Sequence, residues 1–220
     1  MTDVVLGLLS FLIAASAFVF GVRKLFRKKK PLYLQLLVCA AGCFALQQLS
    51  GITLLWCGAA SKTVSIGMLG IFGCNFFLLS ANYGTLDRVV DDGGAENKRA
   101  RRMALTAPVI AAVLMAAVFA AWRSRDLFCA IVWLFMFVPA LPASYFNLKH
   151  ILLPIDDFEI LKATRLCNVA ALCFYVVTAA YIVCTAFEGA VLGGIASIAM
   201  SLSASGLVFA AVRGAEKWGI

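Results

Sequence analysis

The sequence predicts an all-α membrane protein: a bundle of seven transmembrane helices with the N-terminus outside the cell and the C-terminus in the cytoplasm. Hydrophobic residues make up 63% of the 220 residues and charged residues only 14%, whereas soluble domains carry about 25% charged residues. The apolar residues fall into seven runs. The length of each run is close to what a membrane-spanning helix needs, about 20 residues. We therefore expect residues 1–220 to form one transmembrane domain in the plasma membrane.

The apolar runs predict helices over residues 4–22, 32–56, 64–83, 103–122, 127–148, 166–187 and 190–212. The fifth run contains Pro139 and Pro142, which lack backbone donors, so we expect a kink near the bilayer centre. Before the sixth run, residues 154–162 mix acids with spaced apolar residues. This mixture is typical of a short helix at the membrane surface.

The seventh run carries a small residue at every fourth position, at Gly193, Ser197, Ser201 and Ser205. These residues share one face of a helix, because four residues make slightly more than one turn. Small residues let helix backbones approach closely in a membrane. We interpret this stripe as a packing surface.

The basic residues predict the orientation. Seven spans put the turns after the first, third and fifth helices on the side of the C-terminus, and 16 of the 19 Lys and Arg residues lie there. The other side holds Lys62, Arg123 and Arg125. Because loops rich in Lys and Arg stay in the cytoplasm, the N-terminus is expected outside. The net charge of +8 thus reflects topology, and no nucleic-acid partner is expected.

Neutral polar residues lie near the middle of the apolar runs. They are Gln47, Gln48, Asn75, Tyr175, Thr178 and Ser201. The bilayer core offers no water to satisfy such groups, so they must face other helices or a cavity. Two interpretations stay open: hydrogen bonds that hold helices together, and a binding site for a small neutral or apolar ligand. Neighbours on a helix point about 100° apart, so Gln47 and Gln48 need different partners.

Ionisable chemistry is expected to be absent from the spans. All 11 acidic residues fall in loops or at helix ends, and the single histidine, His150, ends the fifth run. We therefore expect no catalytic residue, no cofactor and no bound metal. His150 with Asp156, Asp157 and Glu159 is a minor metal-site alternative to a solvated loop. Cys57, Cys129 and Cys184 lie near the outer face, where a disulfide would persist in an oxidising compartment.

Residues 84–102 form the most polar part of the chain and include Asp92-Gly93-Gly94. Glycine next to charged residues is typical of a mobile loop. On the predicted topology this loop is cytoplasmic. It is therefore the expected docking surface for a signalling partner.

The first three spans resemble a known family. The basic turn from Arg23 to Pro31, the helix start Leu32-Tyr-Leu-Gln-Leu-Leu and the segment Phe76 to Gly84 look like the seven-helix sensor region found before some bacterial histidine kinases. The resemblance implies a bacterial sensor that binds a small ligand within its bundle and signals through its cytoplasmic loops. The output would come from a separate partner, or the chain would be a detached sensor region.

A second interpretation comes from a hint of internal repetition. Residues Ala40 to Phe44 resemble Ala170 to Phe174, and Ser65 to Met68 resemble Ser197 to Met200. A parallel duplication of three helices around a linker helix occurs in some transporters, and the layout is similar to the PQ-loop and SWEET group, whose Pro-Gln pairs are missing here. A small-solute transporter is therefore the alternative, and a membrane enzyme acting on lipid comes third.

Overall fold

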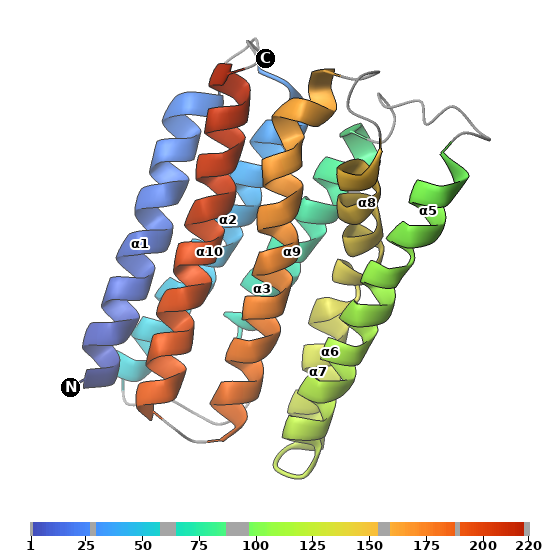
Figure 1. Ribbon diagram of the computed structural model, residues 1–220. Coiled ribbons are helices and arrows are strands. Elements are labelled where there is room, and N and C mark those ends of the chain that lie inside the picture. Colours follow the sequence, from blue (N-terminus) through green and yellow to red (C-terminus); the bar gives the residue numbers. More distant parts are fainter. Residues whose placement is uncertain are drawn as a thin grey trace.

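The computed structural model describes residues 2–26, 30–57, 65–86, 97–153, 159–187 and 190–217. These residues form helices and short connections and contain no strand. Figure 1 shows the helices lying side by side along one common direction, with the two termini at opposite ends of the bundle. We call these the N-terminal end and the C-terminal end of the bundle.

The elements in chain order are α1 (Thr2–Leu25), α2 (Leu32–Trp56), α3 (Met68–Leu79), the π-helix η1 (Ser80–Leu86), α5 (Lys98–Ala104), α6 (Thr106–Arg123), α7 (Leu127–Phe137), α8 (Ala140–Leu152), α9 (Glu159–Ala186) and α10 (Ala190–Lys217). By length and composition, six of the described helical stretches can cross a membrane, and residues 68–83 form a shorter apolar helix. The all-helical class is thus confirmed, and the chain has the composition of a multi-pass membrane protein.

Two predicted boundaries are wrong because charged residues did not end the helices. α5 covers residues 98–104, part of the stretch predicted as a loop, and α9 begins at Glu159, so no separate surface helix ends at residue 162. Lys, Arg and Glu are good helix formers, so short charged stretches extend the neighbouring spans. Residues 87–96 and 154–158 of those two predictions lie outside the described residues.

The predicted kink in the fifth span is a break between α7 and α8. Pro139 and Pro142 have no N–H, so the carbonyls of Phe135 and Val138 lose their usual partners four residues on. Each accepts a bond from three residues on instead, from Val138 N at 3.2 Å and from Leu141 N at 3.2 Å. The span therefore continues as two helices, joined by a short stretch in which backbone hydrogen bonds connect residues three apart instead of four.

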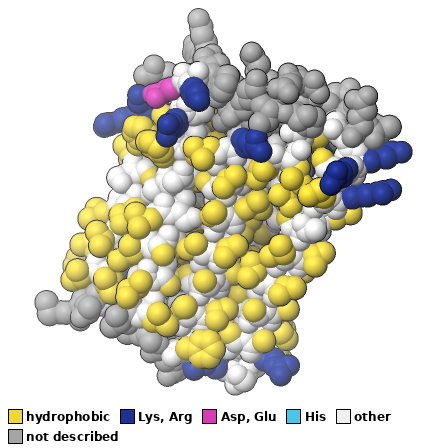
Figure 2. Space-filling view, viewed as in Figure 1, with side chains coloured by type: hydrophobic (Ala, Val, Ile, Leu, Met, Phe, Trp, Pro, Cys, Tyr) yellow, Lys and Arg dark blue, Asp and Glu magenta, His cyan; other side chains and the backbone are white. Residues whose placement is uncertain are grey.

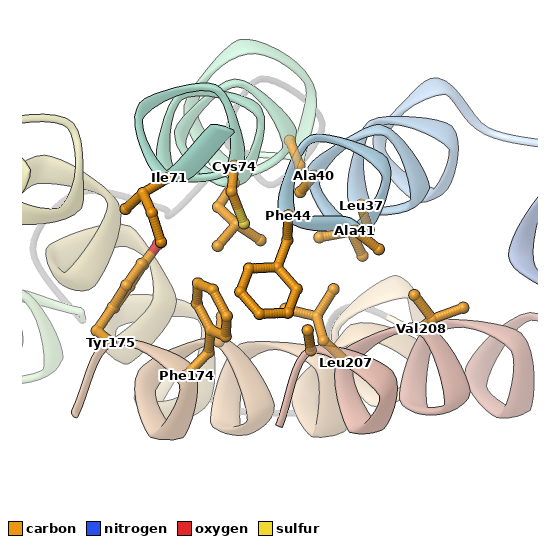
Figure 3. Packing of buried hydrophobic residues seen from close by; sticks show 14 of the residues in the cluster. Leu37, Ala40, Ala41, Phe44, Ile71, Cys74, Phe174, Tyr175, Leu207 and Val208 are labelled. Carbon is orange, nitrogen blue, oxygen red and sulfur yellow. The ribbon is translucent and has the colours of Figure 1, made fainter. Parts of the chain in front are cut away.

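Helices α1, α2, α9 and α10 pack together on one side of the bundle, α3, α7 and α8 lie beside them, and α6 lies at the edge (Figure 1). The core between α2 and α9 contains Phe44 and Phe174, whose rings meet edge to face with centroids 5.7 Å apart. Figure 3 shows the two rings next to each other, with Ala41 and Leu207 close by. The two phenylalanines come from the matching segments of the suggested repeat.

The outer surface agrees with a membrane environment. Figure 2 shows hydrophobic side chains over the flank and Lys and Arg side chains at the two ends of the bundle. At the C-terminal end, Lys24 Nζ and Glu216 Oε1 form an ion pair of 2.8 Å that joins α1 to α10. Both side chains are about half exposed, so the pair contributes little to stability.

Candidate functional site

A pocket of about 280 Å³ lies at the N-terminal end of the bundle, between the starts of α1 and α10 and the ends of α2 and α9. Its polar lining residues are Asp3, Gln47, Gln48, Tyr181, Thr185 and Ser197, and the others are Ile52, Leu55 and the glycines Gly7, Gly51, Gly193 and Gly194. Each of the four helices contributes at least one glycine or polar side chain. The pocket is therefore built by segments far apart in the sequence.

Glycine shapes the pocket in two ways. A Cβ at Gly194 would lie 2.4 Å from Leu6 Cδ1, so the missing side chain lets α10 approach α1. A Cβ at Gly51 would meet nothing within 4 Å. Since Gly51 lines the pocket, the missing side chain at this position leaves the space open.

Gln48 joins α2 to α10 at the pocket wall. Ser197 Oγ donates to Gln48 Oε1 at 3.1 Å, and both side chains are buried, with 8% and 5% of their surfaces exposed. This bond occupies the Gln48 carbonyl, and the Gln48 Nε2 group has no partner. Gln48, a lining residue of the pocket, therefore keeps a buried donor without a partner.

Gln47 points to a different neighbour, as two adjacent residues on a helix must. Its side chain interacts with Tyr181 on α9, and its Oε1 has no hydrogen-bond partner. A buried polar group without a partner costs roughly 1–3 kcal/mol. A ligand that pairs with Gln47 Oε1 and Gln48 Nε2 would recover part of this cost.

Asn75, the third amide of the predicted site, lies elsewhere. It is fully buried on α3, and its Nδ2 donates to the carbonyl of Met136, beside the break between α7 and α8, at 3.0 Å. Its Oδ1 has no partner, but Asn75 does not line the pocket. Asn75 therefore joins α3 to a carbonyl next to the proline break.

Two more of the predicted site residues, Thr178 and Ser201, lie deeper than the pocket. Thr178 comes three residues before Tyr181 on α9, and Ser201 comes four residues after Ser197 on α10, so both lie about one turn below the pocket wall. Both are fully buried, and neither hydroxyl has a partner. The structure thus brings only Gln47 and Gln48 of the six predicted residues into the pocket.

Tyr175 contributes to a second cavity of about 250 Å³ between α6, α8 and α9. Apart from Tyr175 and Ser144, its lining consists of Ala, Ile, Leu and Val side chains. Figure 3 shows the Tyr175 side chain extending from α9 toward the α3 side of the bundle. This cavity offers an apolar wall and few polar groups.

A polar cluster of Asn82, Asn147 and His150 lies toward the C-terminal end of the bundle. Asn82 Nδ2 donates to Asn147 Oδ1 at 2.9 Å, and His150 Nδ1 lies 3.1 Å from Asn82 Oδ1. His150 is only 1% exposed, so this residue is buried within the bundle and is not solvated. Asn147 and His150 are three residues apart and share one face of α8, a spacing that could have indicated this cluster.

Asn82 belongs to the π-helix η1. π-helical turns are rare and occur often at functional sites. The η1 turn places Asn82 against α8, where it joins Asn147 and His150.

The cysteines and possible metal ligands give no further site. All eight cysteines lie in described segments and are free thiols, including Cys57, Cys129 and Cys184. Within the described segments no three His, Cys, Asp or Glu side chains gather closely enough to hold a metal ion. The structure does not describe Asp156, Asp157 or the side chain of Glu159.

Comparison of the chain with protein-family models, with curated proteins and with solved structures finds no match. The described residues thus form an α-helical bundle in which six helical stretches are long and apolar enough to cross a membrane, with a polar pocket at the N-terminal end.

Proposed function

We propose that the protein is a seven-helix receptor-like membrane protein that binds a small ligand in the pocket between α1, α2, α9 and α10. The observation that carries this proposal is the pair of unpaired amide groups there, Gln47 Oε1 and Gln48 Nε2. Ligand pockets combine apolar walls with a few polar groups placed to fix orientation. The volume of about 280 Å³ suits a small molecule.

The proposal includes seven spans with the pocket facing outward. α3 and η1 have 12 and 7 residues and together reach about 28 Å at 1.5 Å per residue, close to the hydrocarbon thickness of about 30 Å. They supply the seventh span. With 16 of 19 basic residues on the side of the C-terminus, the positive-inside rule favours an outer N-terminal end and the plasma membrane.

The pocket has a direct structural connection to the cytoplasmic side. α9 and α10 each have 28 residues and run from the pocket to the C-terminal end. A ligand that changes the spacing of α2 and α10 at Gln48 and Ser197 would move the inner end of α10 as well, because packed helices shift as rigid elements. The cytoplasmic partner would then dock on residues 84–102, of which η1 and α5 contribute the described parts.

Filling the pocket tests the proposal. Gly51→Leu would place a side chain in open space without a backbone clash. Gly206→Leu is the matched control, because a Cβ at Gly206 also meets nothing within 4 Å and Gly206 is exposed on the flank. Both variants should fold with nearly unchanged thermal stability.

The measurement is a thermal-shift screen of polar metabolites on purified protein in detergent. A ligand present at 100 times its Kd stabilises a protein by about 2.7 kcal/mol, which raises Tm by several degrees. Metabolites that stabilise the unmodified protein and Gly206→Leu should fail to stabilise Gly51→Leu. Ligands that stabilise all three proteins equally would place the binding site elsewhere.

Small-solute transport is the second candidate, favoured by the contact between Phe44 and Phe174. These residues occupy matching positions of the suggested repeat, and their rings meet in the core, as expected for two repeats related by an axis through the bundle. They would separate the outer pocket from the inner cluster of Asn82, Asn147 and His150. Flux of a pocket ligand into liposomes would favour this candidate; binding without flux would favour the receptor.

A further inference from the structure

We propose that the ligand of the outer pocket is a small primary amine, bound as its ammonium ion, with a hydroxyl or carbonyl group nearby. This inference rests on the proposed function, since it concerns the same pocket. It is drawn from the hydrogen-bonding state of the lining side chains, which offer more acceptors than donors.

Two of the three hydroxyl side chains that line the pocket, Ser197 and Thr185, already donate their protons within the protein. Ser197 Oγ gives its proton to Gln48 Oε1 at 3.1 Å, and Thr185 Oγ1 gives its proton to the Ile182 carbonyl at 2.8 Å. A hydroxyl has one proton and two lone pairs. Both side chains can therefore accept a bond from a ligand but have no proton left to give.

Two further oxygen acceptors complete the set. Gln47 Oε1 is buried without a partner, and Asp3 lines the pocket as an exposed residue in the first turn of α1. All lining residues belong to the described segments, and none of them is Lys, Arg or His. A carboxylate ligand would meet these oxygens unfavourably, whereas an ammonium group has three protons to donate to them.

The helix ends around the pocket do not reverse this preference. α1 and α10 present their N-termini, and α2 and α9 present their C-termini. Helix N-termini favour anions and C-termini favour cations by similar amounts. With two of each, the dipoles largely cancel and the side chains decide the preference.

An unpaired amide donor of the lining predicts the second group of the ligand. Gln48 Nε2 has no partner and can donate only to an oxygen or nitrogen lone pair. A hydroxyl or carbonyl on the ligand supplies such an acceptor without bringing a negative charge near Asp3. Small amino alcohols and amino amides combine both features.

Thiol labelling tests the preference without a known ligand. A reactive thiol is introduced by Gly51→Cys, in a Cys57→Ser background, and reacted with 2-aminoethyl, 2-hydroxyethyl and 2-sulfonatoethyl methanethiosulfonate. Native Cys57 of the unmodified protein is the reference, because it is exposed at the end of α2. At each thiol, the labelling rates of two reagents are compared as a ratio. Differences in intrinsic reactivity between the two thiols then cancel.

The ratio of aminoethyl to sulfonatoethyl labelling should be roughly tenfold higher at Gly51→Cys than at Cys57, the effect of one charge-assisted hydrogen bond. Adding Asp3→Asn should lower that ratio about two- to fivefold, as expected for an exposed charge. Equal ratios at both thiols, or faster labelling by the sulfonate, would overturn the amine assignment and leave the pocket in place. A Gly51→Cys thiol that reacts with none of the reagents would overturn the pocket and hence both proposals.

Discussion

At the scale of single residues, the proposed site depends on which atoms of the buried Gln47 and Gln48 amides are hydrogen-bonded to neighbouring helices and which have no partner. Gln47 and Gln48 are adjacent, yet one interacts with Tyr181 on α9 and the other accepts from Ser197 on α10. Each amide retains one unpaired atom. An amide that only holds helices together is expected to use both ends, because an unpaired buried group costs stability.

The Ser197–Gln48 bond gives a prediction at this scale. Interhelical hydrogen bonds in membranes average about 0.6 kcal/mol, so Ser197→Ala should lower the free energy of unfolding by about that amount. Gln48→Leu should change stability by about 1 kcal/mol or less, because it also removes the unpaired Nε2. Its ligand-dependent thermal shift should nevertheless disappear.

Leu46→Ala is the control for these variants, because Leu46 is 64% exposed on the other face of α2. It should retain the ligand-dependent shift. If the loss of stability in Gln48→Leu fully explained the loss of binding, Gln48 would be a packing residue only.

At the scale of elements, polar side chains lie where the helices are irregular. The break between α7 and α8 is joined to α3 by Asn75, and the π-helix η1 is joined to α8 by Asn82. Irregular turns expose backbone groups or change side-chain directions, so they need local polar partners. Buried Asn and His residues in membrane spans supply them.

Asn75→Ala tests the assignment of Asn75 to the break. It removes the donor to the Met136 carbonyl and should lower the free energy of unfolding by about 1–2 kcal/mol, measured in mixed detergent micelles by circular dichroism. Ligand binding in the outer pocket should be unchanged. Phe76→Ala, which truncates a half-exposed neighbour, is the control. Normal stability with lost binding would instead make Asn75 a ligand-binding residue.

Sequence reasoning worked best where a residue acts through the backbone or through bulk hydrophobicity. The apolar run over residues 32–56 matches α2, and Pro139 predicted the irregularity in the fifth span. The sequence could not predict which helix each buried amide faces, because this depends on which helices are neighbours in the bundle. Asn75 resembles Gln48 in type and depth, yet it faces α7, while Gln48 faces α10.

At the scale of the whole molecule, the pocket depends on segments from the two ends of the chain. Asp3 and Gly7 come from α1, and Gly193 and Ser197 come from α10. The serine stripe of α10 contacts two helices. Ser205 Oγ lies 3.4 Å from the Ile13 carbonyl of α1, and Ser197 Oγ donates to Gln48 of α2. Closing the bundle through α1 and α10 thus creates the pocket.

On the proposed function, a water-accessible pocket opens to the outside at Gly51. In a Cys57→Ser background, spheroplasts carrying Gly51→Cys are treated with the membrane-impermeant reagent 2-(trimethylammonium)ethyl methanethiosulfonate. Gly206→Cys, on the flank of α10, is the control. We expect the Gly51→Cys thiol to be modified from outside and the Gly206→Cys thiol to stay unmodified. Modification of Gly51→Cys only in inside-out vesicles, or in neither preparation, would contradict this expectation.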